Sequence, residues 1–214
     1  MNINNYLEKI KIIQQNIIEY VDEYDDQEEN YEKVINSLEL IKEDQHEIKT
    51  FLYLIDCITK YHHRSSNFYE KIERIIQHFK IEIKGNYSNH SLFKIFKHNK
   101  RLLLYFIQEK IIEIDDNLLT KMSNELYSNM KYFDYFSPEI SFFQKTKVDS
   151  ERELDEKFNE KRLIGDNDNI ICEMIRNDMI EEFIVFVNKH EYRLDSYIPE
   201  SIFETNYTLI KNEE

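Results

Sequence analysis

Apolar side chains recur at three- and four-residue steps along most of this chain, which is the spacing of an amphipathic helix. The first apolar stripe covers residues 7–21, and three others cover 34–41, 48–58 and 68–79. Polar stretches separate these stripes, among them the acidic run Glu19–Glu32. The pattern therefore predicts a chain built from successive helices.

Two later segments share one plan, in which a short apolar helix, a two- or three-residue polar turn and a longer apolar helix follow one another. They are residues 90–114 and 168–194, and residues 50–83 repeat the plan more loosely. A short turn makes its two helices antiparallel, so each segment predicts a helical hairpin. Such a hairpin covers its apolar face by stacking on a neighbour, as in repeat proteins. We expect an all-α fold of stacked antiparallel helical hairpins, with an irregular helix bundle as the alternative.

The stripes and turns divide the chain into four segments. Residues 1–44 hold N-terminal helices with an acidic connector, and 45–130 hold helical hairpin repeats. Residues 131–148 are expected to form a non-helical insert, because they combine a proline with a cluster of Phe and Tyr side chains. Residues 149–214 predict a charged helix followed by the last hairpin. We expect the four segments to form one continuous folded unit.

Charge is unevenly placed within a total of −14. Residues 1–59 carry 5 basic and 14 acidic side chains, residues 60–110 carry 11 and 4, and residues 149–214 carry 8 and 18. The basic middle is either a surface for an anionic partner or a complement to acidic side chains of the same chain. The total charge repels a polyanion, and the aromatics follow helical core spacing rather than that of a stacking platform. Binding of an anionic partner is therefore a minor alternative, and nucleic acid is not expected.

Composition and motifs give no sign of an enzyme. Two glycines do not suffice for a phosphate-binding loop, and the chain has no HExxH, GxSxG or Walker-type run. We therefore expect no catalytic residue and no cofactor. The nearest approach to a metal site is Cys57 with His46, His62 and His63, but no CxxC or HxxxH spacing supports it, so no metal is expected.

The same features bear on location. No basic segment followed by a clean apolar stretch begins the chain, and no uncharged apolar stretch approaches the ~20 residues of a membrane span. Cys57 and Cys172 each lie inside an apolar helical pattern, which is typical of small buried side chains in a reducing compartment. We expect a cytoplasmic protein with no membrane contact.

Residues 171–178, Ile-Cys-Glu-Met-Ile-Arg-Asn-Asp, resemble a degenerate ankyrin repeat in which Asn177-Asp178 replaces the usual Gly-His turn. Further stretches resemble trichomonad-type protist ankyrin-repeat proteins, which carry an uncharacterised helical region ahead of their repeats; these stretches are 62–68, 135–140, 164–168 and 201–206. The resemblance covers about residues 40–210. It implies a degenerate ankyrin-like solenoid, a protein-binding role and no enzyme activity.

The sequence departs from this family in two ways. The ankyrin Thr-Pro-Leu-His opening is absent, so the hairpins are free to stack differently. The chain reaches Glu214 where the regular repeats should start, which leaves an expected apolar surface uncapped.

We therefore expect a non-enzymatic protein–protein interaction module. The predicted binding face is the turn and helix start that carry four cations, namely Lys94, Lys97, Lys100 and Arg101. The alternative is a capping or self-associating helical domain with no ligand of its own, in which case a homo-oligomer is expected.

Overall fold

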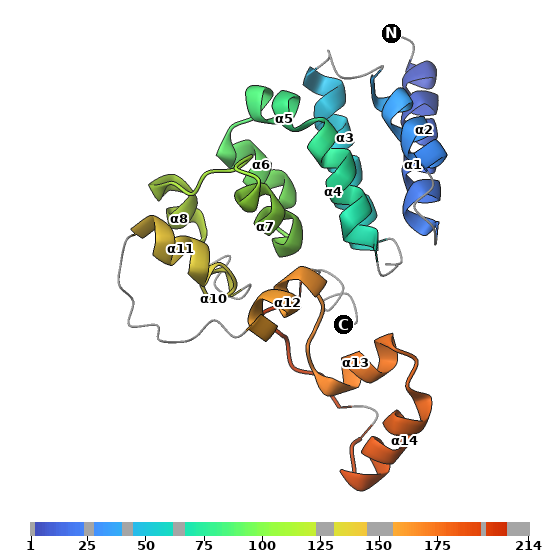
Figure 1. The fold of residues 1–214 in the computed structure, drawn as a ribbon, viewed down its shortest axis with the longest axis vertical. Coiled ribbons are helices and arrows are strands. Elements are labelled where there is room, and N and C mark those ends of the chain that lie inside the picture. Colours follow the sequence, from blue (N-terminus) through green and yellow to red (C-terminus); the bar gives the residue numbers. More distant parts are fainter. Residues whose placement is uncertain are drawn as a thin grey trace. The chain divides into compact units, whose positions relative to one another are not determined.

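A computed structural model describes residues 3–23, 28–39, 45–61, 67–122, 131–144, 156–193 and 196–204. Over these residues the chain forms thirteen helices and no strand, which confirms the all-α prediction (Figure 1). The helices are α1 (Ile3–Asp22), α2 (Glu28–Glu39), α3 (Gln45–Tyr61), α4 (Phe68–His78), α5 (Lys80–Asn86), α6 (Asn89–Phe96), α7 (Lys100–Gln108), α8 (Asp116–Met122), α10 (Tyr132–Tyr135), α11 (Ser137–Gln144), α12 (Glu156–Ile164), α13 (Ile170–Arg176) and α14 (Ile180–Lys189). Within this described part of the chain, no helix has the length and apolar character that crossing a membrane requires.

The chain divides into two compact units. Unit 1 comprises Met1–Phe96 with Tyr105–Glu113, and unit 2 comprises Lys97–Leu104 with Ile114–Glu214. Helix α7 contributes its first half to unit 2 and its second half to unit 1. These boundaries differ from those of the four predicted segments, whose role as one continuous folded unit stays a prediction.

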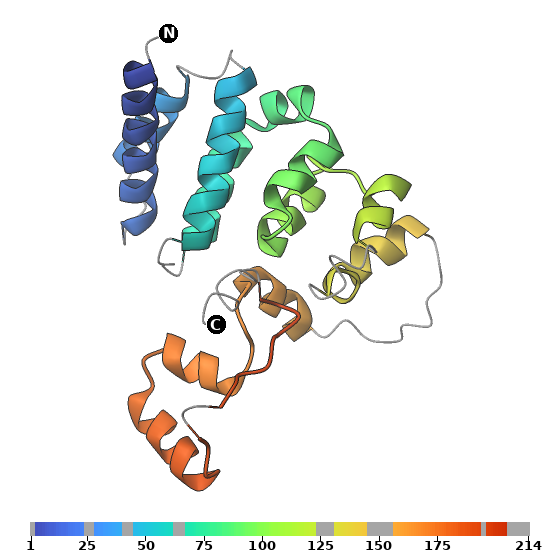
Figure 2. The same cartoon turned by 180° about the vertical axis from the view of Figure 1, so that it is seen from behind.

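Unit 1 is built from helices that lie side by side. Helix α1 packs along α2, α4 contacts both, and α3 contacts α6; Figures 1 and 2 show these neighbours from opposite sides. The apolar stripes read from the sequence become the core, because the side chains at three- and four-residue steps point to one face. Buried members of that core include Ile13, Ile17, Val34, Leu38, Ile72, Ile75 and Ile76.

Two cations of the basic middle hold α4 against the α1–α2 pair. The buried Lys71 amine donates to the carbonyl oxygens of Tyr20 at 2.8 Å and Glu23 at 2.7 Å, at the carboxyl end of α1. The partial negative charge at a helix C-terminus favours such a cation. The Arg74 guanidinium lies 3.7 Å from the centre of the Tyr31 ring and forms an ion pair of 2.6 Å with Glu28. Part of the basic middle therefore complements groups of the same chain.

Helix α7 ends without glycine. The Lys110 N–H donates to the Ile107 carbonyl and the Ile111 N–H to the Phe106 carbonyl, both hydrogen bonds of a Schellman motif. That motif needs a left-handed residue, and Lys110 has a φ of 56°. A chain with two glycines thus places an ordinary residue where glycine is usual.

Unit 2 corrects the expectation for residues 131–148. Residues 132–135 and 137–144 are helical, as α10 and α11, so a non-helical insert is wrong for them; residues 145–148 lie outside the described part. Pro138 lies in the first turn of α11, where a missing N–H breaks no helical hydrogen bond. The aromatic cluster instead forms a core, with Tyr132, Tyr135 and Phe136 buried.

Candidate interaction surface

The structure places the four predicted binding cations in different surroundings. Lys94 is exposed on α6, and Lys97 is half-buried in the turn before α7. Lys100 and Arg101 begin α7 and are only 3% and 5% exposed. These two side chains are therefore not available to a partner, and the prediction of an exposed cationic face is wrong for them.

Lys100 anchors a distant segment of unit 2. Its amine donates to the Ile202 carbonyl at 2.6 Å and lies 5.1 Å from the centre of the Tyr135 ring. Burial lowers the pKa of Lys100 to about 8, and Glu204 opposes that effect. Arg101 has a similar structural role, because its Nε donates to the Leu163 carbonyl at 2.8 Å. Sequence periodicity gives no signal for either contact, since the acceptors lie 62 and 102 residues away.

Another buried cation, Arg162, joins α10, α11 and α12. The Arg162 guanidinium forms two hydrogen bonds with the Glu139 carboxylate, at 2.6 and 2.9 Å, and donates to the Tyr135 carbonyl at 3.0 Å. Arg162 is 2% exposed and lies over the rings of Tyr135 and Phe158. With its charge paired and its plane covered by aromatics, this arginine holds unit 2 together and does not face a ligand.

The α13–α14 hairpin was predicted from its polar turn, and both helices are present. Asn169 caps α13, because its side-chain oxygen accepts from the Ile171 N–H at 3.0 Å. A Schellman motif ends the helix: Asp178 N–H donates to the Ile175 carbonyl, Met179 N–H donates to the Met174 carbonyl, and Asp178 has a φ of 54°. The chain then turns directly into α14.

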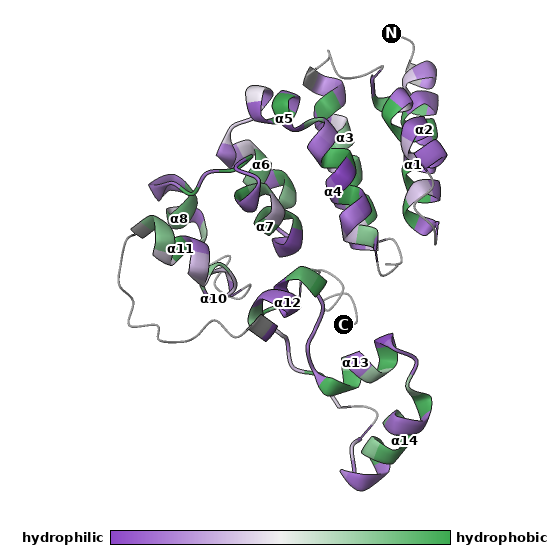
Figure 3. Ribbon diagram, in the orientation of Figure 1, coloured by the Kyte–Doolittle hydropathy of each residue, from purple (hydrophilic) through white to green (hydrophobic). Residues whose placement is uncertain are grey.

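Helix α14 is apolar but only partly covered by the residues that the structure describes. Six of its ten residues are Ile, Val or Phe, and none of them is buried. Ile180, Ile184 and Val185 are 60%, 52% and 63% exposed, and Ile175 of α13 is 63% exposed. Green segments mark this apolar character on α13 and α14 in Figure 3. The predicted hairpin thus presents to solvent the kind of surface that the helices of unit 1 bury.

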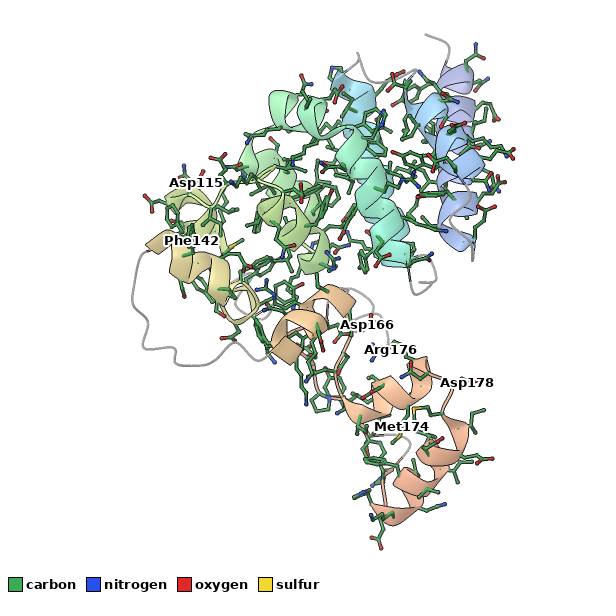
Figure 4. The ribbon with its side chains drawn as sticks, viewed as in Figure 1. Asp115, Phe142, Asp166, Met174, Arg176 and Asp178 are labelled. Atoms are coloured by element: carbon green, nitrogen blue, oxygen red, sulfur yellow. The ribbon has the colours of Figure 1, made fainter. Side chains whose placement is uncertain are left out.

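A hollow lies between the two helices at their turn. We call it the hairpin hollow; its volume is about 180 Å³, and it is lined by Met174, Ile175, Asp178, Met179, Ile180 and Phe183. Figure 4 shows Met174 on α13 and Asp178 at the turn. Five of the six lining side chains are apolar, so the hollow suits an apolar group rather than a charged one.

Three carboxylates lie at the turn and the start of α14. Asp178 lines it, and Glu181 and Glu182 occupy the first turn of α14. None of these three forms an ion pair within the described residues, whereas Arg176 is paired with Asp166 at 2.8 Å (Figure 4). The amino end of α14 therefore carries negative charge that no ion pair within the described residues compensates.

The two cysteines lie in different surroundings. Burial raises the pKa of the Cys172 thiol, with a further contribution from Glu204, so the thiol stays protonated at neutral pH. Cys57 is exposed on α3. Among the residues that the structure describes, no three His, Cys, Asp or Glu side chains form a cluster for a metal ion. His62 and His63 lie outside those residues.

Comparison with known proteins finds no matching protein-family model, no curated protein similar to this chain and no solved structure that resembles it.

Proposed function

We propose that this chain is a non-enzymatic protein–protein interaction module of the ankyrin-like helical-hairpin type, and that the α13–α14 hairpin contacts the partner. The observation that carries the proposal is α14, in which six of ten residues are apolar and none is buried. Burial of apolar surface stabilises a complex by about 25 cal/mol per Å². Contiguous apolar patches on a protein surface are typical of interaction sites. The ankyrin resemblance of residues 171–178 supports the same role.

The binding surface in this proposal is the hairpin rather than the predicted lysine face. Lys100 and Arg101 are committed to carbonyl oxygens of their own unit. The exposed isoleucines of α13 and α14, in contrast, can be covered by a partner without breaking a hydrogen bond.

The test compares two double variants with the unaltered chain. Ile180→Ser with Ile184→Ser removes apolar surface from the hairpin, while Leu7→Ser with Ile12→Ser removes it from α1, where the side chains are 51% and 57% exposed. Each tagged chain is used to co-purify proteins from a lysate of the source cell. The proposal expects a partner that the hairpin variant loses and the α1 variant keeps. Equal recovery with both variants would refute the hairpin as the binding surface.

Sedimentation velocity separates this proposal from self-association. A monomer across the micromolar range is expected of a module whose partner is another protein. A dimer that the Ile180→Ser with Ile184→Ser variant dissociates would show that the hairpin covers its apolar surface with a second copy. Because both changes are at exposed positions, circular dichroism should show unaltered helicity.

A further inference from the structure

The hairpin hollow has room for one large apolar side chain. Its volume is about 180 Å³, and cavities of about 150 Å³ accept a benzene molecule. Met174 and Met179 line it, and methionine side chains are flexible and polarizable enough to adapt to the shape of an incoming group. A leucine or phenylalanine of a partner is therefore the natural occupant.

The exposed stripe beside the hollow extends the contact along α14. Ile180 and Ile184 are four residues apart, so they lie one above the other on the same face of the helix. An amphipathic helix places its own apolar residues at the same three- and four-residue spacing. Such a helix can insert one side chain into the hollow and lay the next ones along Ile184.

The charges select which kind of amphipathic helix fits. Asp178 lines the hollow, and Glu181 lies beside the Ile180–Ile184 stripe in the first turn of α14, with Glu182 farther round the same turn. None of the three forms an ion pair within the described residues. Lysine or arginine at the edges of a docked helix would face them, whereas acidic edges would be repelled.

We propose that the α13–α14 hairpin binds a basic amphipathic helix of another protein, with one large apolar side chain in the hairpin hollow and basic side chains facing Asp178 and Glu181, while Glu182 adds to the negative charge of the same helix end. This inference rests on the proposed function and names the chemistry of its partner. A second copy of the chain fits less well, because a symmetric contact brings the same surface of both copies together. Both copies would then bring the same negatively charged carboxylates to one interface, which is electrostatically unfavourable.

The probe is a fluorescein-labelled 18-residue peptide with Leu and one Phe on one helical face and Lys on the other. Its matched control carries Glu in place of every Lys. Fluorescence anisotropy with the full chain measures both affinities at low salt. The proposal expects micromolar binding of the Lys peptide and at least tenfold weaker binding of the Glu peptide. Equal binding of the two peptides would overturn the charge assignment.

Variants then locate the binding site. Changing Asp178→Asn, Glu181→Gln and Glu182→Gln together should weaken binding of the Lys peptide about tenfold, since each exposed ion pair contributes only a few-fold to the affinity. Asparagine suits the left-handed position of residue 178 as well as aspartate does, so the turn should persist.

A matched triple variant, Glu32→Gln with Glu70→Gln and Glu160→Gln, removes three exposed carboxylates from other helices and should change the affinity less than twofold. An equal loss with this control would show a general attraction to an acidic protein and overturn the proposal.

The apolar contact is tested separately, by the affinity of a variant that lacks the exposed isoleucines. Ile180→Ser with Ile184→Ser should weaken the Lys peptide more than tenfold, and unaltered binding would overturn the docking mode. If neither peptide binds but co-purification of a cellular partner still depends on these isoleucines, the basic-helix inference fails and the proposed function stands. If co-purification does not depend on these isoleucines either, the proposed function is refuted as well. A dimer formed through the hairpin would overturn the basic-helix inference, because the occupant of the hollow would then be a second copy of this chain.

Discussion

Lys100 gives a quantitative test of the packing of unit 2. Lys100 is 3% exposed, and burial lowers the pKa of its amine from 10.5 to about 8. At 1.36 kcal/mol per pKa unit, this shift corresponds to roughly 3 kcal/mol. Between pH 8 and 10.5 the unfolded chain holds a proton on this amine that the folded chain has released, so the free energy of unfolding rises with pH in that window. Well below pH 8 both states are protonated, so the free energy of unfolding no longer changes with pH through this group, and the full cost of the buried charge is present.

The perturbation is Lys100→Met, which keeps the aliphatic volume and removes the titrating group. Urea unfolding of both proteins at pH 7, 8, 9 and 10 gives the difference in free energy of unfolding, unaltered chain minus variant. This difference should rise by about 2–3 kcal/mol from pH 7 to pH 10. The control is Lys94→Met, whose side chain is exposed on α6, and its difference should stay flat. A flat or falling difference for Lys100→Met would refute the reasoning that the folded state desolvates this amine.

Three further changes test individual contacts by urea unfolding at pH 7. Arg162→Ala leaves the Glu139 carboxylate, 17% exposed, without its counter-charge and should cost about 3–5 kcal/mol; a cost below 1 kcal/mol would contradict a buried ion pair. Lys71→Met removes two hydrogen bonds from a buried ammonium to the end of α1 and should cost about 2–3 kcal/mol, and a neutral result would show that solvent replaces them. Lys110→Gly relieves a left-handed residue and should stabilise the chain by about 1 kcal/mol, so a loss of stability would argue against a φ of 56°.

The pattern of apolar residues was sufficient to predict the helices, because helix formation depends on residues that are close together in the sequence. The stripes at 7–21, 34–41, 48–58 and 68–79 correspond to helices because amphipathic spacing is a local property. Pro138 misled the prediction, since a proline in the first turn of a helix and one that interrupts a helix look alike in sequence.

The candidate surface could be predicted only in part. The α13–α14 hairpin and its Asn177-Asp178 turn were visible as a short polar break between two apolar segments. The exposure of these two helices could not be predicted, because α14 has the apolar composition of a buried core helix. Whether such a helix is covered depends on which other elements reach it.

The sequence by itself therefore determined the helical class, most helix positions and the turns before α7 and α14, all of which follow from spacing and turn chemistry within a few residues. The predicted turn at 62–66 lies outside the described residues. Only the tertiary structure decided that Lys100 and Arg101 are buried anchors and that Ile180 and Ile184 are exposed. The reason is that burial is set by partners far along the chain: the acceptors of Lys100 and Arg101 are the carbonyls of Ile202 and Leu163. A cation at a helix start and an apolar stripe on a helix have the same sequence pattern whether a distant segment covers them or not.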